Sequence, residues 1–117
     1  MINIDYTNRT PIYEQIVNEI ERYVTLGILK PNQKIESVRE LASNLGINPN
    51  TVKKAYDELE RRNVITTAST KGTFIASDIN SITELKINEK LGIIKAEILE
   101  LQKLGISKEE IIKKITE

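Results

Sequence analysis

Apolar residues recur every three or four positions in five stretches of the chain, and this spacing is typical of amphipathic helices. The first stretch predicts a helix from about Pro11 to Leu26, with Thr10 as its N-cap and Gly27 at its end. Residues 28–35 then predict a turn that carries a short extended piece, because a Pro-Asn pair interrupts the pattern there.

Two short helices joined by a tight turn follow. Ser37 and Glu40 have the spacing of a capping box, which predicts the start of the second helix. The third helix is expected to begin at Pro49, behind an N-cap at Asn48, and to end near residue 62. Its expected buried stripe consists of Val52, Ala55, Tyr56 and Leu59. A pair of helices with so short a connection is typical of a helix-turn-helix.

A β-hairpin is expected directly after this pair. Residues 64–68 and 73–75 are rich in β-branched side chains, and the turn Ser69–Gly72 separates them. An isolated hairpin is only marginally stable, so it must pack on the helices. The order of helix, helix-turn-helix and hairpin predicts a mostly α winged-helix domain over residues 1–78, followed by two C-terminal helices over residues 79–117.

The C-terminal segment has a strongly apolar face and few residues with which to bury it. One expected helix ends at Gly105, and a second capping box at Ser107 opens the last short helix. About 35 residues rarely form an independent core, so these helices either fold back on the first domain or pair with another chain. We favour pairing. The expected dimerisation residues are Leu85, Leu91, Ile94, Ile98, Leu101, Ile111, Ile112 and Ile115.

Composition narrows the possible functions. The chain has 117 residues, of which 39% are hydrophobic and 29% charged, as in a globular protein. It contains neither cysteine nor histidine, so the usual thiol nucleophile, the usual neutral-pH base and the commonest metal ligands are missing. We therefore expect no enzyme, no metal site and no cofactor. No apolar run approaches the ~20 residues of a membrane span and no signal peptide is evident, so we expect a cytoplasmic protein without membrane contact.

The charge of the chain is a weaker indicator of function than its composition. The formal net charge is zero, whereas nucleic-acid-binding domains are often basic. Any DNA contact must therefore come from a local patch. Between residues 48 and 75 the charged residues are Lys53, Lys54, Arg61, Arg62 and Lys71 against Asp57, Glu58 and Glu60. We expect Asp57 and Glu58 to face away from DNA, and the two arginines to form a solvated helix end.

The stretches PIYEQIVNEIERYVTLGILKPNQKI, ESVRELASNLGINPNTVKKAYDELERRNVI and TKGTFIA together resemble the DNA-binding domain of GntR-family transcription regulators, over residues 10–77. The stretch LQKLGISKEEIIKKI resembles the two-helix tail of the YtrA subfamily, which serves there as a dimerisation unit. The resemblance implies a homodimer on a palindromic operator. It also implies repression of the regulator's own operon, which often encodes a transporter.

The resemblance and the side-chain chemistry together give a set of candidate DNA contacts. The family pattern implies that Arg39 reaches DNA from the second helix and that the start of the third helix faces bases and phosphates. It also implies that the hairpin tip approaches the minor groove or its phosphates. Many members have an arginine where this chain has Pro49, so neighbouring asparagine and threonine side chains are expected to read more of the sequence. The candidates are Ser37, Arg39, Asn48, Asn50, Thr51, Lys53, Lys54, Thr70, Lys71 and Gly72.

The residues alone leave two other classes open. A winged-helix module that binds protein would tolerate a net charge of zero, and a gel shift with the chain's own promoter separates it from a DNA-binding protein. A small enzyme would need carboxylates at catalytic or metal-binding spacing, and the sequence has no such cluster. No polar cluster marks a site for a small-molecule effector either.

Overall fold

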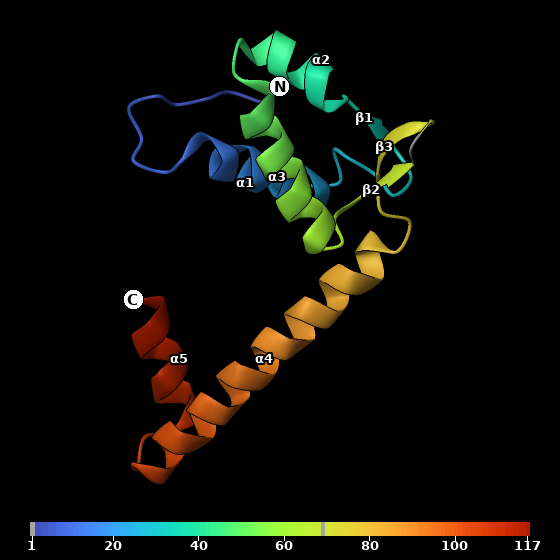
Figure 1. Cartoon of the computed structure of the whole chain (residues 1–117). Coiled ribbons are helices and arrows are strands. Elements are labelled where there is room, and N and C mark those ends of the chain that lie inside the picture. Colours follow the sequence, from blue (N-terminus) through green and yellow to red (C-terminus); the bar gives the residue numbers. More distant parts are fainter. Residues whose placement is uncertain (1, 69) are drawn as a thin grey trace. The chain divides into compact units, whose positions relative to one another are not determined.

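A computed structural model of the protein describes residues 2–68 and 70–117 (Figure 1). The chain forms two compact units, Met1–Ile79 and Asn80–Glu117, called here the first and second units. The first unit contains three helices and a small sheet, and the second contains the rest of a long helix and a short one. The mostly helical fold with a small β element is confirmed.

The first helix, α1, spans Ile12–Thr25, and its N-cap is Pro11. The expectation of a cap at Thr10 is therefore wrong. The reason is the buried side chain of Gln15, whose amide donates to the carbonyl oxygens of Thr10 (2.9 Å) and Asp5 (3.0 Å). The Gln15 side chain also accepts the N–H of Asp5 at 2.9 Å. These bonds tie the segment before α1 to the helix and leave Thr10 outside it.

The helix-turn-helix is formed by α2, Val38–Leu45, and α3, Pro49–Arg61. Both bonds of the predicted capping box are present: Ser37 Oγ accepts the Glu40 N–H, and the Glu40 carboxylate accepts the Ser37 N–H, each at 3.1 Å. Gly46 ends α2 with a φ of 67°, a conformation that favours glycine. The tight turn fixes the start of α3 close to the end of α2.

Three strands, not two, form the antiparallel sheet. The strands are β1, Lys34–Ile35, β2, Ile65–Ala68, and β3, Gly72–Ile75, in the order β1-β3-β2. The predicted hairpin is β2 and β3, with Thr66 opposite Phe74. The short extended piece before α2 is β1, which pairs along the other edge of β3. Strand β3 is thus paired along both edges, and the third strand supports the hairpin better than the hairpin alone.

A single core holds the first unit together. Fully buried side chains come from α1, α3 and the sheet: Ile16, Val17, Val52, Leu59, Ile65 and Ile75. The predicted stripe of α3 is confirmed, since all four of its residues are buried. Because α3 packs against α1, α2 and β2, its opposite side is presented to solvent on a rigid base.

The second unit consists of α4, Ile79–Lys103, from residue 80 onward, and α5, Lys108–Thr116. Ser107 caps α5 by accepting the Glu110 N–H at 3.2 Å, and Gly105 has a φ of 96° in the turn before it. Figure 1 shows the chain turning back after α4, with α5 leading away from the end of α4 at an angle. In the described part of the chain, no helix is long and apolar enough to cross a membrane.

Candidate nucleic-acid interface

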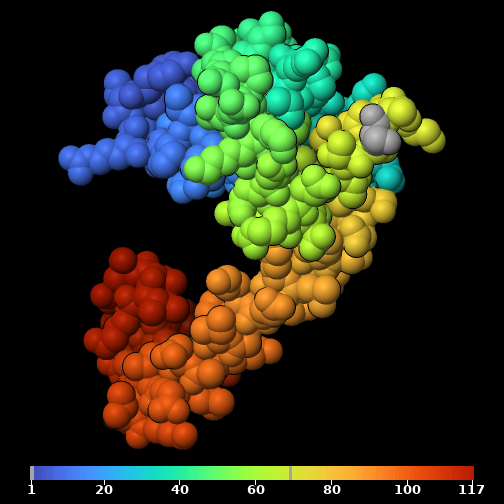
Figure 2. Space-filling view, viewed as in Figure 1, coloured from blue at the N-terminus to red at the C-terminus, as the bar shows by residue number. Residues whose placement is uncertain are grey.

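A shallow groove on the first unit brings together α2, α3 and the sheet. Arg39 of α2, Asn50 and Lys53 of α3, and Thr67 and Thr73 of the two hairpin strands line it. Figure 2 shows α3 (green) filling the space between α1 (blue) and the hairpin (yellow). Of the candidate contacts, Arg39, Asn50 and Lys53 share this surface, because α2 and α3 pack on the same core.

The start of α3 presents small polar groups. Asn48 Oδ1 accepts the Asn50 N–H at 2.8 Å, so this side chain serves as the helix cap. The side chain of Asn50 is exposed and makes no hydrogen bond within the described residues, while Thr51 is half-buried. A free amide at the first turn of a recognition helix can form a bidentate contact with adenine in the major groove. Asn50 is therefore the side chain at this end that is best placed to read a base.

Both lysines of α3 already have partners within the chain. Lys53 Nζ lies 3.0 Å from a carboxylate oxygen of Asp57, one turn further along the helix. Lys54 Nζ lies over the ring of Tyr13, 4.1 Å from its centroid. Asp57 lines both the groove that holds Asn50 and the groove between α3 and α1. Lys53 therefore has to exchange a carboxylate for a phosphate if it is to bind DNA.

The start of α2 is held by its cap and by α3. The hydrogen bonds between Glu40 and the backbone and hydroxyl of Ser37 hold the pKa of Glu40 below its ordinary value. Tyr56 of α3 donates its hydroxyl to the carbonyl oxygen of Glu36 at 2.6 Å, and burial raises the pKa of Tyr56. Arg39 is exposed and forms no ion pair among the described residues. The guanidinium of Arg39 is thus free to bind a ligand, while the cap and the Tyr56 bond hold the start of α2 in place.

The hairpin tip is the third part of the surface. Thr70 and Lys71 are exposed, and the Lys71 N–H donates to the carbonyl of Ala68 at 3.0 Å. Gly72 has a φ of 118°, which disfavours any other residue. Ser69, expected in this turn, lies outside the described residues.

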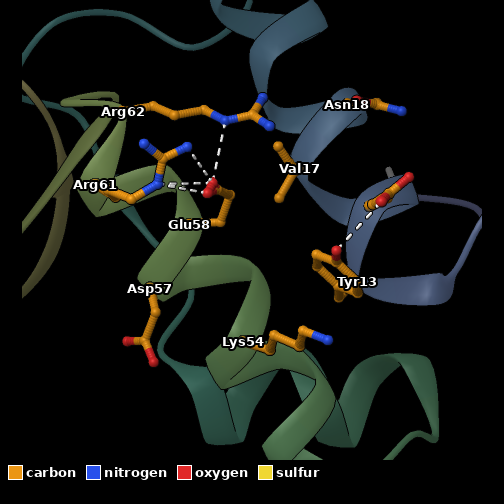
Figure 3. A pocket seen from close by; sticks show the side chains of 9 residues that line it. Tyr13, Val17, Asn18, Lys54, Asp57, Glu58, Arg61 and Arg62 are labelled. Carbon is orange, nitrogen blue, oxygen red and sulfur yellow. Dashed lines mark hydrogen bonds and ion pairs between the residues drawn. The ribbon is translucent and has the colours of Figure 1, made fainter.

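The other side of α3 faces α1 across a second groove (Figure 3). There Glu58 accepts bonds from Arg61, at 2.7 Å, and pairs with Arg62 at 3.4 Å. The bond from Arg61 holds the pKa of Glu58 below its ordinary value. Arg62 also pairs with Glu21 of α1 at 2.9 Å. Arg61 is thus a solvated helix end, as expected, whereas Arg62 forms an ion pair that joins α3 to α1.

The expected dimerisation residues lie on both helices of the second unit. Ile111 is buried but is not part of the first unit's core, Ile98 is half-buried, and the other six are exposed: Leu85, Leu91, Ile94, Leu101, Ile112 and Ile115. Within the continuous helix α4, Ile87 lies four residues before Leu91 and continues the stripe, whereas Leu85 lies on another side. The sequence analysis did not separate the face of Leu91 from that of Leu85, because it did not treat residues 79–103 as one continuous helix.

Comparison with known proteins gives the site its context. A family model described as bacterial regulatory proteins, gntR family, matches residues 12–75. The HTH-type transcriptional repressor YtrA of Bacillus subtilis is 46% identical over 101 residues, which are 86% of this chain and 75% of the repressor. A transcriptional regulator from Oenococcus oeni is 39% identical with a TM-score of 0.70, over 99% of this chain and 97% of that one.

Several similar structures are complexes of AraR with operator DNA. The DNA-binding domain of AraR in complex with operator ORR3 is 31% identical with a TM-score of 0.52, over 55% of this chain and 77% of that one. The relatives are named as regulators and not as enzymes. Among residues 2–68 and 70–117, no group of three acidic, histidine or cysteine side chains is arranged to hold a metal ion.

Proposed function

Because the chain belongs to the GntR family of bacterial transcription regulators, with a DNA-binding helix-turn-helix, we propose that it is a homodimeric repressor of the YtrA type that binds a palindromic operator. The observation that carries the proposal is the similarity to the repressor YtrA, which extends beyond the winged helix into the second unit. We further propose that the operator lies in the regulator's own operon, with a transporter operon as the leading candidate, and that the protein acts in the cytoplasm.

The side chains that have no partner within the described chain support different roles for the candidate contacts. Asn50 presents a free amide for a base edge, whereas Arg39 and Lys71 present cations without carboxylate partners in the described chain. Phosphate contacts fix the position of a protein on the duplex, and base contacts give specificity. We therefore assign the reading of bases to the start of α3, and the binding of the DNA backbone to α2 and the wing. The wing is the hairpin of β2 and β3 together with its tip.

A titration with DNA from the chain's own promoter tests this assignment. A dimer that makes about six phosphate contacts should show a slope near −5 in a plot of log affinity against log salt concentration. A slope near zero, or no binding to the promoter at any salt concentration, contradicts the proposal and favours the protein-binding alternative.

The dimer is proposed from the exposed apolar stripe of α4. Ile87, Leu91, Ile94, Ile98 and Leu101 are spaced alternately by four and three residues, which is the spacing of a coiled-coil seam. Three of these side chains, Ile87, Leu91 and Ile94, are 45–53% exposed in the single chain. A second copy of the same helix would bury them from water, which favours association by about 25 cal/mol per Å² of apolar surface.

A charge in the stripe tests the dimer. Ile94→Glu should give a folded monomer in sedimentation experiments, because the carboxylate would be buried at the seam. Ala96→Glu is the matched control, since Ala96 is exposed and lies on the opposite side of the same helix. If Ile94→Glu remains a dimer, the stripe is not the interface.

A further inference from the structure

The wing carries a second lysine that comes from outside the hairpin. Lys34 belongs to β1, which pairs with β3 in the register Lys34 opposite Phe74. Phe74 and Gly72 lie on the same face of β3, since side chains alternate along a strand. The side chain of Lys34 therefore leans along this face toward the hairpin tip.

The contact with Gly72 fixes how close Lys34 comes to the tip. A Cβ atom placed on Gly72 would lie 2.8 Å from Lys34 Cε and 3.5 Å from Lys34 Nζ. The ammonium group thus lies beside the residue that follows Lys71. Because Gly72 has no side chain, the stem of Lys34 can lie across the strand at this point.

The ammonium of Lys34 is available to an outside ligand. The residue is exposed, and its side chain forms no ion pair or hydrogen bond with any residue in the described ranges. The charge of Lys34 contributes to lowering the pKa of Glu40, but the Glu40 carboxylate is already hydrogen-bonded to Ser37 in the capping box. Lys34 therefore differs from Lys53, whose charge is matched by Asp57.

We propose that Lys34 is a phosphate-binding residue of the wing and that, with Lys71, it forms a pair of cations that holds the DNA backbone. The inference rests on the proposed contact of the wing with DNA. An ammonium is a compact charge that suits a phosphate oxygen and does not distinguish bases. The pair therefore adds affinity for any duplex and leaves the preference for the operator unchanged.

The test replaces Lys34 with Met, which keeps an unbranched apolar stem over Gly72 and removes the charge. Loss of one contact per subunit should reduce the salt slope of a dimer by about 1.8. The ratio of wild-type to variant affinity should accordingly fall about 12-fold between 50 and 200 mM salt, on operator and scrambled duplex alike. Lys34→Arg should restore the slope.

Two controls separate the possible failures. Lys30→Met removes an exposed lysine four residues earlier, whose ammonium bonds the carbonyl of Gly27 at 3.2 Å, and it should leave the slope unchanged. Lys71→Met reports on the wing itself. If Lys71→Met lowers the slope and Lys34→Met does not, the assignment of Lys34 is wrong. If neither changes it while Asn50→Ala weakens operator binding, the wing does not touch DNA, and the proposed wing contact fails together with this inference.

Discussion

Replacing Asp57 with asparagine should strengthen DNA binding, although the change lies in the recognition helix. The ammonium of Lys53 is 3.0 and 3.1 Å from the two carboxylate oxygens of Asp57. A phosphate that binds Lys53 must compete with this carboxylate. In Asp57→Asn the competitor loses its charge, and Lys53 is free for the phosphate.

The geometry of the pair sets the size of the effect. The two side chains are 64% and 61% exposed and lie one helical turn apart. An exposed pair of this kind is worth about 0.3–0.5 kcal/mol. A dimer must break the pair in both subunits, so the affinity should rise about three- to fivefold. Since Lys53 is assigned to phosphate, the gain should be similar on operator and scrambled duplex.

A double-mutant cycle checks the route of this effect. Fluorescence anisotropy titrations would compare the wild type, Asp57→Asn, Lys53→Met and the double variant on both duplexes. The gain from Asp57→Asn should nearly vanish when Lys53 is absent. An undiminished gain in the Lys53→Met background would refute the reasoning, because Asp57 would then act on DNA directly and not through Lys53.

Three further changes test other parts of the first unit. Asn50→Ala should cost about 1–3 kcal/mol on the operator and much less on a scrambled duplex in the same titration, and equal losses would remove Asn50 from the base-reading set. Tyr56→Phe should lower the free energy of unfolding in urea by about 1–3 kcal/mol, because the Glu36 carbonyl loses its donor. Since burial raises the pKa of folded Tyr56, wild-type stability should be retained at neutral pH and fall above about pH 10, and Tyr56→Phe should lack this part of the fall. Glu21→Gln should lower stability by under ~1 kcal/mol and leave DNA affinity unchanged, because its pair with Arg62 is about one-third exposed and lies in the α1–α3 contact.

The elements that the sequence predicts well are those whose signals are local. The Ser37–Glu40 capping box, the Asn48 cap and the buried stripe of α3 depend on residues at most seven positions apart, and the structure contains them. Of the second predicted box, at Ser107, the structure has only the bond from the Glu110 N–H to the Ser107 hydroxyl. The Lys53–Asp57 pair could also have been expected, since oppositely charged residues four apart in a helix face each other. The error at Thr10 is local as well. Its cause is the amide of Gln15, which ties the preceding segment to the helix from the inside.

The features that sequence analysis missed depend on contacts between distant residues. The sequence predicts the short extended piece that is β1, but it does not show that this piece pairs with β3 about 39 positions later. The link between Glu21 and Arg62 spans 41 positions. The place of Lys34 beside Gly72 follows from the same strand pairing, so an exposed lysine in a turn gave no sign of its position on the wing.

These contacts explain how a chain with no net charge can present unpaired cations on part of its surface. Many of its cations near the recognition helix are neutralised internally: Lys53 by Asp57, and the two arginines at the end of α3 by Glu58 and Glu21. In the described chain, the cations without such a carboxylate partner include Arg39, Lys34 and Lys71, which lie on α2 and the wing. A local phosphate contact depends on cations that remain unpaired near the phosphate, because charges further apart than about 8 Å are largely screened at physiological salt. Composition counts all charges equally, and it therefore underestimates how far α2 and the wing can attract a phosphate backbone.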